Sequence, residues 1–446
     1  MGSMDAQTEH MKQLHGIIPT VRYDDGFGND GFDAAKTGHD GGETAGYGDR
    51  AADSGIDPAD LPPAELHRDG RLHLSSVLPA VSAAIGHPVG TAIHHDPARL
   101  RDALGLPEAR SAIVVLVDGL GYWNLRLRIG HCPYMRSLLH DSANLRPIST
   151  CAPSTTVAAM AAFGTGTCPG LTGMTGYTQR NTRTGELSQL IQFKNAIDPH
   201  ELQRQPTVFE RLSGQGVRVT SCGLPKFAGS PLTEAALRGA RYIGDMRPSA
   251  RVKAAAEAAR TPGLTYLYIR DVDKTGHADG WESPQWTAVF ERVDGQLGQL
   301  ARQAPKDTLI VIVADHGMVS ADPAARVDIA QEPQLSRDVA LVGGEPRSVM
   351  LYAQPDADPE DIAARWRDRL GDMALVRTRR QAIDQGMFGP VDPRVEPMIG
   401  DVLVSAAQGT TIVDSRIQTD KATRLPGVHG SQTAMEMDIP CLIDLV

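Results

Sequence analysis

Two pairs of aspartate and histidine have the residue types and spacing of metal ligands. Asp315 and His316 are adjacent, whereas Asp273 and His277 are four residues apart, with Gly276 permitting a tight bend before the histidine. Zinc takes histidine nitrogens and carboxylate oxygens as ligands. Each pair therefore suits zinc, although a single aspartate after a strand is more often a helix cap or a turn former.

A short run of hydroxyl residues could supply a nucleophile. Ser154, Thr155 and Thr156 follow Pro153 and precede an alanine-rich stretch that stops at Gly164, which predicts a helix that begins near the hydroxyls. Free backbone N–H groups and the dipole at a helix start favour an anion. The same pattern is typical of an ordinary N-cap before a buried helix, so the segment alone leaves both interpretations open.

These side chains must be positioned by strands that end close together. Continuous apolar runs at 112–117, 217–221, 265–269 and 308–314 are typical of strands covered on both faces in a parallel sheet. Asp118, Asp273 and Asp315 stand at or just beyond the ends of three runs, where function collects in open α/β sheets.

The stretch between the last two runs predicts a helix. Its apolar residues, from Trp286 to Leu300, recur at spacings of three and four. The strand–helix–strand order implies a right-handed crossover. The expected fold class is therefore α/β, with a mainly parallel central sheet and helices on both faces.

Composition bounds the domain organisation. Residues 24–55 are rich in glycine and aspartate and poor in aliphatic side chains, so they cannot bury enough surface to repay their ordering entropy. We predict a flexible tail at 1–58 and a catalytic domain at 59–446. An inserted, cap-like segment is expected near 178–245.

Charge and cysteine content restrict partners and location. The formal net charge of −10, without a long basic run, argues against a stable nucleic-acid complex. The sequence contains neither an apolar run long enough to span a membrane nor an export-signal pattern. Its five cysteines form no CxxC spacing, which favours reduced structural thiols. We therefore expect a cytoplasmic protein that does not associate with membranes, and oligomeric state remains open.

Five short motifs occur in an order that resembles the nucleotide pyrophosphatase/phosphodiesterase branch of the alkaline phosphatase superfamily. They are Asp118-Gly119, Pro153 to Thr156 with Thr165-Gly166 beyond, Asp273 to His277, Asp315-His316-Gly317 and Val428-His429-Gly430. The order is the specific feature, because each motif alone is too short to be decisive. The resemblance implies an alkaline-phosphatase-like fold over most of the chain.

The resemblance also implies two divalent metal ions, which we expect to be zinc. It assigns Asp273, His277 and His429 to one ion. It assigns the other ion to a second set, which consists of Asp118, Thr156, Asp315 and His316. Three carboxylates and a threonine alkoxide would balance the charge of two zinc ions before an anionic substrate enters.

The family's spacing selects Thr156 as the nucleophile. The family's threonine stands three residues after a proline and nine before a Thr-Gly pair, and both distances, from Pro153 and from Thr165, give Thr156. A sulfatase is disfavoured, because Thr155 stands where the motif beginning at Cys151 would require an arginine.

The resemblance implies a metal-dependent phosphoester hydrolase that acts on a nucleotide or a related small molecule through a phosphothreonine. A phosphomonoesterase or a phosphonate hydrolase with the same two metals is the alternative. A mutase relative and a non-enzymatic metal-binding module are disfavoured, because the whole ligand set and a threonine hydroxyl are present.

Substrate contacts are less well specified by the sequence. The Val157 amide could donate to a phosphoryl oxygen at the helix start. Tyr177 stands where many relatives carry an asparagine that contacts phosphate, which puts the preference between diester and monoester in doubt. We take as further candidates three residues of the predicted insertion, together with one residue before a later strand: Phe193, Lys194, Lys226 and Arg347. For Arg347, pairing with Glu345 is the alternative.

Overall fold

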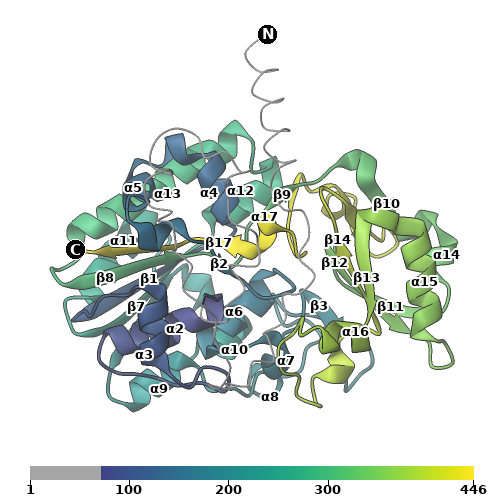
Figure 1. The fold of residues 1–446 in the computed structure, drawn as a ribbon, viewed down its shortest axis with the longest axis horizontal. Coiled ribbons are helices and arrows are strands. Elements are labelled where there is room, and N and C mark those ends of the chain that lie inside the picture. Colours follow the sequence, from purple (N-terminus) through teal and green to yellow (C-terminus); the bar gives the residue numbers. More distant parts are fainter. Residues whose placement is uncertain (1–71) are drawn as a thin grey trace, which may run out of the picture.

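The computed structural model describes residues 72–446, and its centre is a six-stranded sheet (Figure 1). In spatial order the strands are β18 (Cys441–Leu445), β8 (Thr308–Val313), β1 (Ser111–Val117), β7 (Gly263–Ile269), β5 (Arg218–Gly223) and β6 (Arg241–Gly244). Only β18 runs antiparallel to its neighbour. The predicted α/β fold with a mainly parallel sheet is confirmed. The tail predicted at 1–58 lies outside the described residues.

The strands form where the sequence has continuous apolar runs. All seven residues of β1 are buried, and β1 pairs in parallel with β7 on one side and β8 on the other. Such a strand has no solvent-facing side, which explains its unbroken aliphatic sequence. The four predicted runs correspond to β1, β5, β7 and β8.

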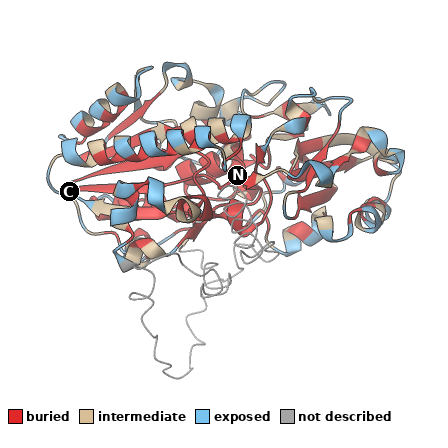
Figure 2. Cartoon of the chain, turned by 90° about the horizontal axis from the view of Figure 1, so that it is seen from above, coloured by how far each residue is buried: buried red, intermediate tan, exposed pale blue. Residues whose placement is uncertain are grey.

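Helices cover both faces of the central sheet (Figure 1). One face carries α2 (Leu74–Ala84), α3 (Pro97–Leu104), α6 (Thr156–Thr165), α9 (Val208–Gly214) and α10 (Pro231–Ala236). The other carries α4 (Tyr122–Leu127), α5 (Pro133–Leu138), α11 (Pro248–Ala258), α12 (Asp271–Asp279) and α13 (Pro284–Gln303). Figure 2 shows, for the helices nearest the viewer, exposed residues on the outer side and buried residues toward the sheet. The predicted amphipathic helix corresponds to α13, which buries Trp286, Val293 and Leu300.

A second, antiparallel sheet lies beside the first, at the right of Figure 1. Its strands are, in order, β11 (Val339–Glu345), β12 (Ser348–Ala353), β14 (Val402–Ala406) and β13 (Ala374–Thr378). Helix α15 (Pro359–Leu370) packs on this sheet through Ile362 and Trp366, which gives it a core of its own. Short elements at its margins are β10 (Arg326–Asp328), β15 (Thr411–Val413), α14 (Pro333–Ser336) and α16 (Arg379–Asp384).

The predicted insertion at 178–245 is therefore misplaced. Its second half contains β5 and β6 of the central sheet, with α9 and α10 packed beside them. Its first half contains the hairpin β3 (Thr178–Arg180) and β4 (Leu187–Gln189), which contacts β11 of the second sheet. The segment that leaves the central sheet runs from β10 to β15 and separates the Asp315-His316 pair from His429 in the sequence.

Two small strand pairs join segments that lie far apart in the sequence. β9 (Val319–Ser320) pairs with β16 (Gly427–Val428), so the residues just after His316 lie beside those just before His429. β2 (Ile148–Ser149) pairs with β17 (Asp438–Ile439), and α17 (Ala434–Met437) lies between β16 and β17 in the sequence. Among residues 72–446, no helix has the length and apolar character needed to cross a bilayer.

Two buried histidines at the start of the described chain should make the protein sensitive to acid. Ser75 Oγ lies 2.9 Å from His73 Nδ1 and 2.8 Å from His94 Nε2. Burial lowers the pKa of His73 to about 3 and that of His94 to about 4. The unfolded chain binds protons near pH 6.5 whereas the folded chain does not, so stability falls as the pH drops from about 6.5 to 4.

We expect each histidine to contribute up to about 3 kcal/mol to this loss. Urea unfolding of the wild type and of His94→Gln at pH 7 and pH 4.5 would measure it. The variant should lose less stability than the wild type between the two pH values. An equal loss in both proteins would contradict the assignment.

Candidate active site

Three aspartates meet at the carboxyl edge of the central sheet because β8, β1 and β7 are neighbours. Asp118 follows β1 directly, Asp315 lies two residues beyond the end of β8, and Asp273 lies in the first turn of α12 after β7. The backbone N–H of Asp273 donates to the Asp118 carbonyl at 3.0 Å. Gly119, at φ 73°, turns the chain so closely past Asp273 that a Cβ there would lie 2.8 Å from the Asp273 Cβ. Only glycine allows this approach.

One group of potential ligands consists of Asp273, His277 and His429. His277 Nε2 lies 3.2 Å from Asp273 Oδ1 and 3.2 Å from His429 Nε2. His277 Nδ1 lies 2.8 Å from the Gly427 carbonyl oxygen, and His429 Nδ1 lies 2.9 Å from the Ser154 carbonyl oxygen. A carbonyl only accepts, so each Nδ1 carries the proton and each Nε2 lone pair faces the group. This is the tautomer that a metal ligand requires.

A second group consists of Asp118, Asp315, His316 and Thr156. His316 Nε2 lies 3.5 Å from Asp118 Oδ1, 3.5 Å from Asp315 Oδ2 and 3.1 Å from Thr156 Oγ1. The other Asp315 oxygen accepts from the backbone N–H groups of Gly119 and His316. The rings of His316 and His429 stack at 3.5 Å, so the two groups adjoin.

The residues present fit bound cations. In these two groups, three buried carboxylate oxygens have no hydrogen-bond donor among the described residues: Asp118 Oδ1, Asp273 Oδ1 and Asp315 Oδ2. Burial, and then the charges of Asp315 and Asp273, raises the pKa of Asp118 well above its usual value. Burial, and then His316 and His277, lowers the pKa of His429. A cluster of buried carboxylates is costly without positive charge, which divalent cations would supply.

Thr156 opens α6 at the base of this cluster. The N-cap residue Thr155 makes no side-chain capping hydrogen bond, and the helix continues as a fully buried stretch to Thr165. The first amides of the helix, which include that of Val157, therefore lack a side-chain acceptor, and such amides bind anions well. The helix predicted to begin near the hydroxyl residues is confirmed, and it begins at Thr156.

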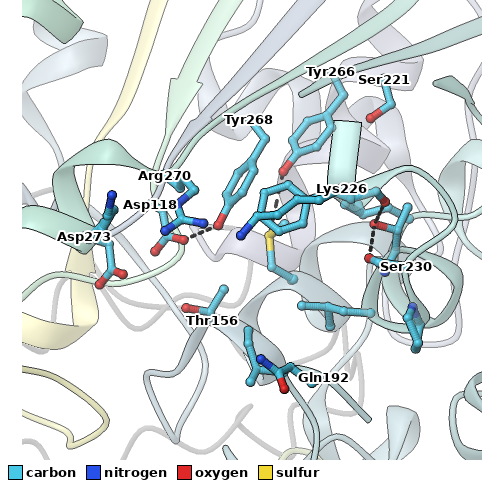
Figure 3. Close-up of a pocket in the computed structure, with 18 of the residues that line it drawn as sticks. Asp118, Thr156, Gln192, Ser221, Lys226, Ser230, Tyr266, Tyr268, Arg270 and Asp273 are labelled. Atoms are coloured by element: carbon cyan, nitrogen blue, oxygen red, sulfur yellow. Dashed lines mark hydrogen bonds between the residues drawn. The ribbon is translucent and has the colours of Figure 1, made fainter. Parts of the chain in front are cut away.

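A cavity of about 550 Å³ opens beside Thr156 (Figure 3). Asp118, Thr156, Asp273 and His277 line it together with residues from β5, α10 and β7. Its other walls include four apolar side chains: Met160, Ile191, Leu232 and Leu237. The cavity thus joins the aspartate–histidine cluster to an apolar recess large enough for a small organic molecule.

The predicted substrate contacts are placed unequally. Lys226 lines the cavity, and Val157 follows Thr156 in the first turn of α6. Tyr177 does not line the cavity, and its hydroxyl accepts a hydrogen bond from Gln189 Nε2 at 2.9 Å. Phe193 and Lys194 close the turn after β4 and also lie outside the lining, which takes two earlier residues of that turn, Ile191 and Gln192.

Arg347 cannot contact an anionic substrate. Its side chain is completely buried and forms an ion pair of 2.8 Å with Glu436, rather than with Glu345. It also donates to the carbonyls of Ala407 and Thr410. The prediction of an anion contact was wrong, because an arginine with these partners is fully satisfied. Its role is to attach the second sheet to the segment that follows His429.

Tyr268 was missed in the sequence, where it resembled any inward-facing strand residue. Its hydroxyl donates to Asp118 Oδ2, and its ring packs edge-on against Phe227 at 5.7 Å. Burial raises the pKa of Tyr268 well above its ordinary value, so it stays a donor. The available signal was a tyrosine, with its polar hydroxyl, near the end of a strand that pairs with the strand preceding Asp118.

We expect Tyr268→Phe to weaken metal binding by about 10-fold to 100-fold, since partners of metal ligands have effects of this size. The ring is kept, so the fold should be unaffected. Metal affinity measured by competition with a chelator checks this. Tyr242→Phe, also in the cavity wall, is the matched control, and equal effects in both variants would remove the role from Tyr268.

One family model and several solved structures are similar to this chain. A family model described as type I phosphodiesterase / nucleotide pyrophosphatase matches residues 112–432. Murine ectonucleotide pyrophosphatase / phosphodiesterase 5 has a similar structure, with a TM-score of 0.60 and 15% identity over 75% of this chain and 87% of that chain. An inactive form of it with alanine in place of a threonine was solved in complex with AMP.

A second similar structure is phosphonoacetate hydrolase from Sinorhizobium meliloti 1021. Its TM-score is 0.57, with 21% identity over 76% of this chain and 90% of that chain, and it was solved with phosphonoformate and with phosphonoacetate. No curated protein sequence matches the chain significantly.

Proposed function

The chain belongs to the type I phosphodiesterase / nucleotide pyrophosphatase family, and from this we propose that Thr156 is its nucleophile and that it cleaves small phosphodiesters through a phosphothreonine. As a member of that family it is a hydrolase of phosphoester bonds. The observation that carries the proposal is the position of Thr156. Its Oγ1 stands at the uncapped start of α6, 3.1 Å from His316 Nε2, and faces the cavity.

Two divalent cations, which we propose to be zinc, would occupy the adjoining groups. Asp273, His277 and His429 would hold one ion, and their ligand atoms lie within 4.8 Å of one another. The other ion would be held by four residues: Asp118, Thr156, Asp315 and His316. When bound, such cations lower the pKa of a coordinated hydroxyl and offset negative charge at phosphorus.

The residues of the chain then divide the reaction between them. Thr156 Oγ forms a bond to phosphorus while the bond to the leaving oxygen breaks and its electron pair departs with the leaving group. Water later attacks the same phosphorus, and the Thr156 oxygen leaves and regains a proton. The Val157 amide at the helix start is placed to donate to a nonbridging oxygen, where charge develops.

The apolar recess supports a diester or anhydride over a simple monoester. Met160, Ile191 and Leu232 would stay in contact with water beside a monoester with a small leaving group, whereas a second organic group could cover them. The murine relative solved with AMP supports a nucleotide-sized ligand. We also propose a cytoplasmic location, based on the five cysteines, which cell fractionation would test.

The expected result is that the zinc-loaded protein cleaves bis(4-nitrophenyl) phosphate at least about 10-fold more efficiently, in kcat/KM, than 4-nitrophenyl phosphate. Both release the same chromophore, so one absorbance assay compares them. Faster cleavage of the monoester would assign the protein to the phosphomonoesterase alternative. Absence of all hydrolysis with zinc restored would favour a metal-binding module.

A further inference from the structure

Three cationic side chains line the cavity that contains Thr156. Lys226 lies in a single turn (Pro225–Phe227) directly after β5, whereas Arg270 follows β7 and Lys274 lies in the first part of α12. Because β5 and β7 pair in parallel, their ends bring these residues to one side of the cavity. In Figure 3, Arg270 lies beside Asp118 and Tyr268, and Lys226 extends toward the same region.

These three cations have no direct acidic partner in the described chain. Within residues 72–446, none of the three forms an ion pair or a hydrogen bond with an acidic side chain, whereas most arginines near the second sheet do. Partial burial, and then the charges of Arg270 and Lys274, lowers the pKa of Lys226. The charges of Arg270 and Lys274 therefore repel the Lys226 ammonium across the cavity, in a protein whose formal net charge is −10. An anion between them would remove this repulsion.

We propose that Lys226, Arg270 and Lys274 form a subsite for a second anionic group of the substrate, close to the phosphorus that Thr156 attacks. This inference rests on the proposed function and names its substrate class. The preferred substrates are compounds in which a phosphate or a carboxylate lies within a few bonds of the scissile phosphorus. A nucleoside polyphosphate and a phosphonocarboxylate share this chemistry.

The position of the cations relative to the reacting group supports this class. Arg270 and Lys274 flank Asp273 in the chain, so they lie at the reacting end of the cavity. Lys226 is followed by Phe227, which also lines the cavity and packs against Tyr268. The second anion would therefore lie between the scissile phosphorus and the apolar recess. A diester with two neutral groups has nothing to place there.

Selectivity tests the subsite directly. We would measure kcat/KM for ATP, for phosphonoacetate and for bis(4-nitrophenyl) phosphate with the wild type, Lys226→Met and Arg270→Met. Each substitution should lower kcat/KM for ATP or phosphonoacetate, relative to kcat/KM for bis(4-nitrophenyl) phosphate, by about 10-fold. The reason is that each substitution removes one charge-assisted contact. Arg270→Lys should recover part of the loss. The matched control is Lys306→Met, an exposed lysine at the opposite end of the sheet, for which the ratio should stay at the wild-type value.

The substrates also identify the source of the second anion. A drop confined to ATP assigns a second phosphate, and a drop confined to phosphonoacetate assigns a carboxylate. Equal losses on all three substrates, or no loss on any, would overturn the subsite. Calorimetric binding of inorganic pyrophosphate to the zinc-loaded Thr156→Ala protein does not depend on turnover. Weaker pyrophosphate binding to the double variant Thr156→Ala/Arg270→Met than to Thr156→Ala would support the subsite even if the proposed function failed. Unchanged binding would overturn it.

Discussion

Replacement of Thr156 by alanine is expected to lower kcat for phosphodiester cleavage by about 10⁴-fold or more, because the oxygen that attacks phosphorus is removed. Three other ligands of its group remain, namely Asp118, Asp315 and His316. Bound metal measured by elemental analysis should therefore stay close to the wild-type amount. A large loss of rate with the metal retained is the outcome that separates a nucleophile from a mere ligand.

Two further variants sharpen this test. Thr156→Ser keeps the hydroxyl and should recover most of the rate, with a phosphorylated residue detectable by mass spectrometry after acid quench. Thr155→Ala removes the neighbouring hydroxyl, whose residue does not line the cavity, and should lower kcat far less than Thr156→Ala. If Thr156→Ala kept more than a tenth of the wild-type kcat, a covalent mechanism through this residue would be excluded.

The sequence predicted those parts of the site that depend on local patterns. Asp118 and Asp315 were found because each follows a buried aliphatic strand, and strand ends of a parallel sheet share an edge. The helix start was predicted from Pro153 and the alanines that follow, whereas the choice of Thr156 among three hydroxyl residues rested only on the resemblance to the family's spacing. His429 has no such local pattern, and only the order of the motifs indicated it.

The parts that were missed depend on contacts between distant segments. Arg347 was expected either to contact an anion or to pair with Glu345, because its actual partner Glu436 lies 89 residues away and on another element. Segment 178–245 looked like an insertion because β6 is short and only partly buried, which gives it no strong aliphatic run. The proposed subsite depends on the pairing of β5 with β7, which brings Lys226 near Arg270 and Lys274, and this pairing was not predicted from the sequence.

The second prediction with a large expected effect is the replacement of Asp118 by asparagine. This change should shift the stability of the folded protein in opposite directions with and without metal. In the metal-free protein, burial and the nearby carboxylates of Asp315 and Asp273 disfavour the Asp118 carboxylate and raise its pKa. A group whose pKa is raised on folding destabilises the fold above its unfolded value, near pH 4. Asp118→Asn removes this penalty and keeps an oxygen that can accept the Tyr268 hydrogen bond. The metal-free variant should therefore be more stable than the wild type at neutral pH, by on the order of 1–2 kcal/mol.

With zinc present, the wild type should be more stable than Asp118→Asn. Cations stabilise the folded state in proportion to the logarithm of their concentration over the dissociation constant, and Asp118→Asn removes a charged ligand from one group. We expect metal affinity at that group to fall at least about 100-fold and kcat to fall with it. Thermal unfolding of both proteins, with chelator and with added zinc, measures both signs in one experiment. A variant less stable than the wild type in chelator would show that Asp118 is a structural residue rather than a carboxylate held in place for a cation.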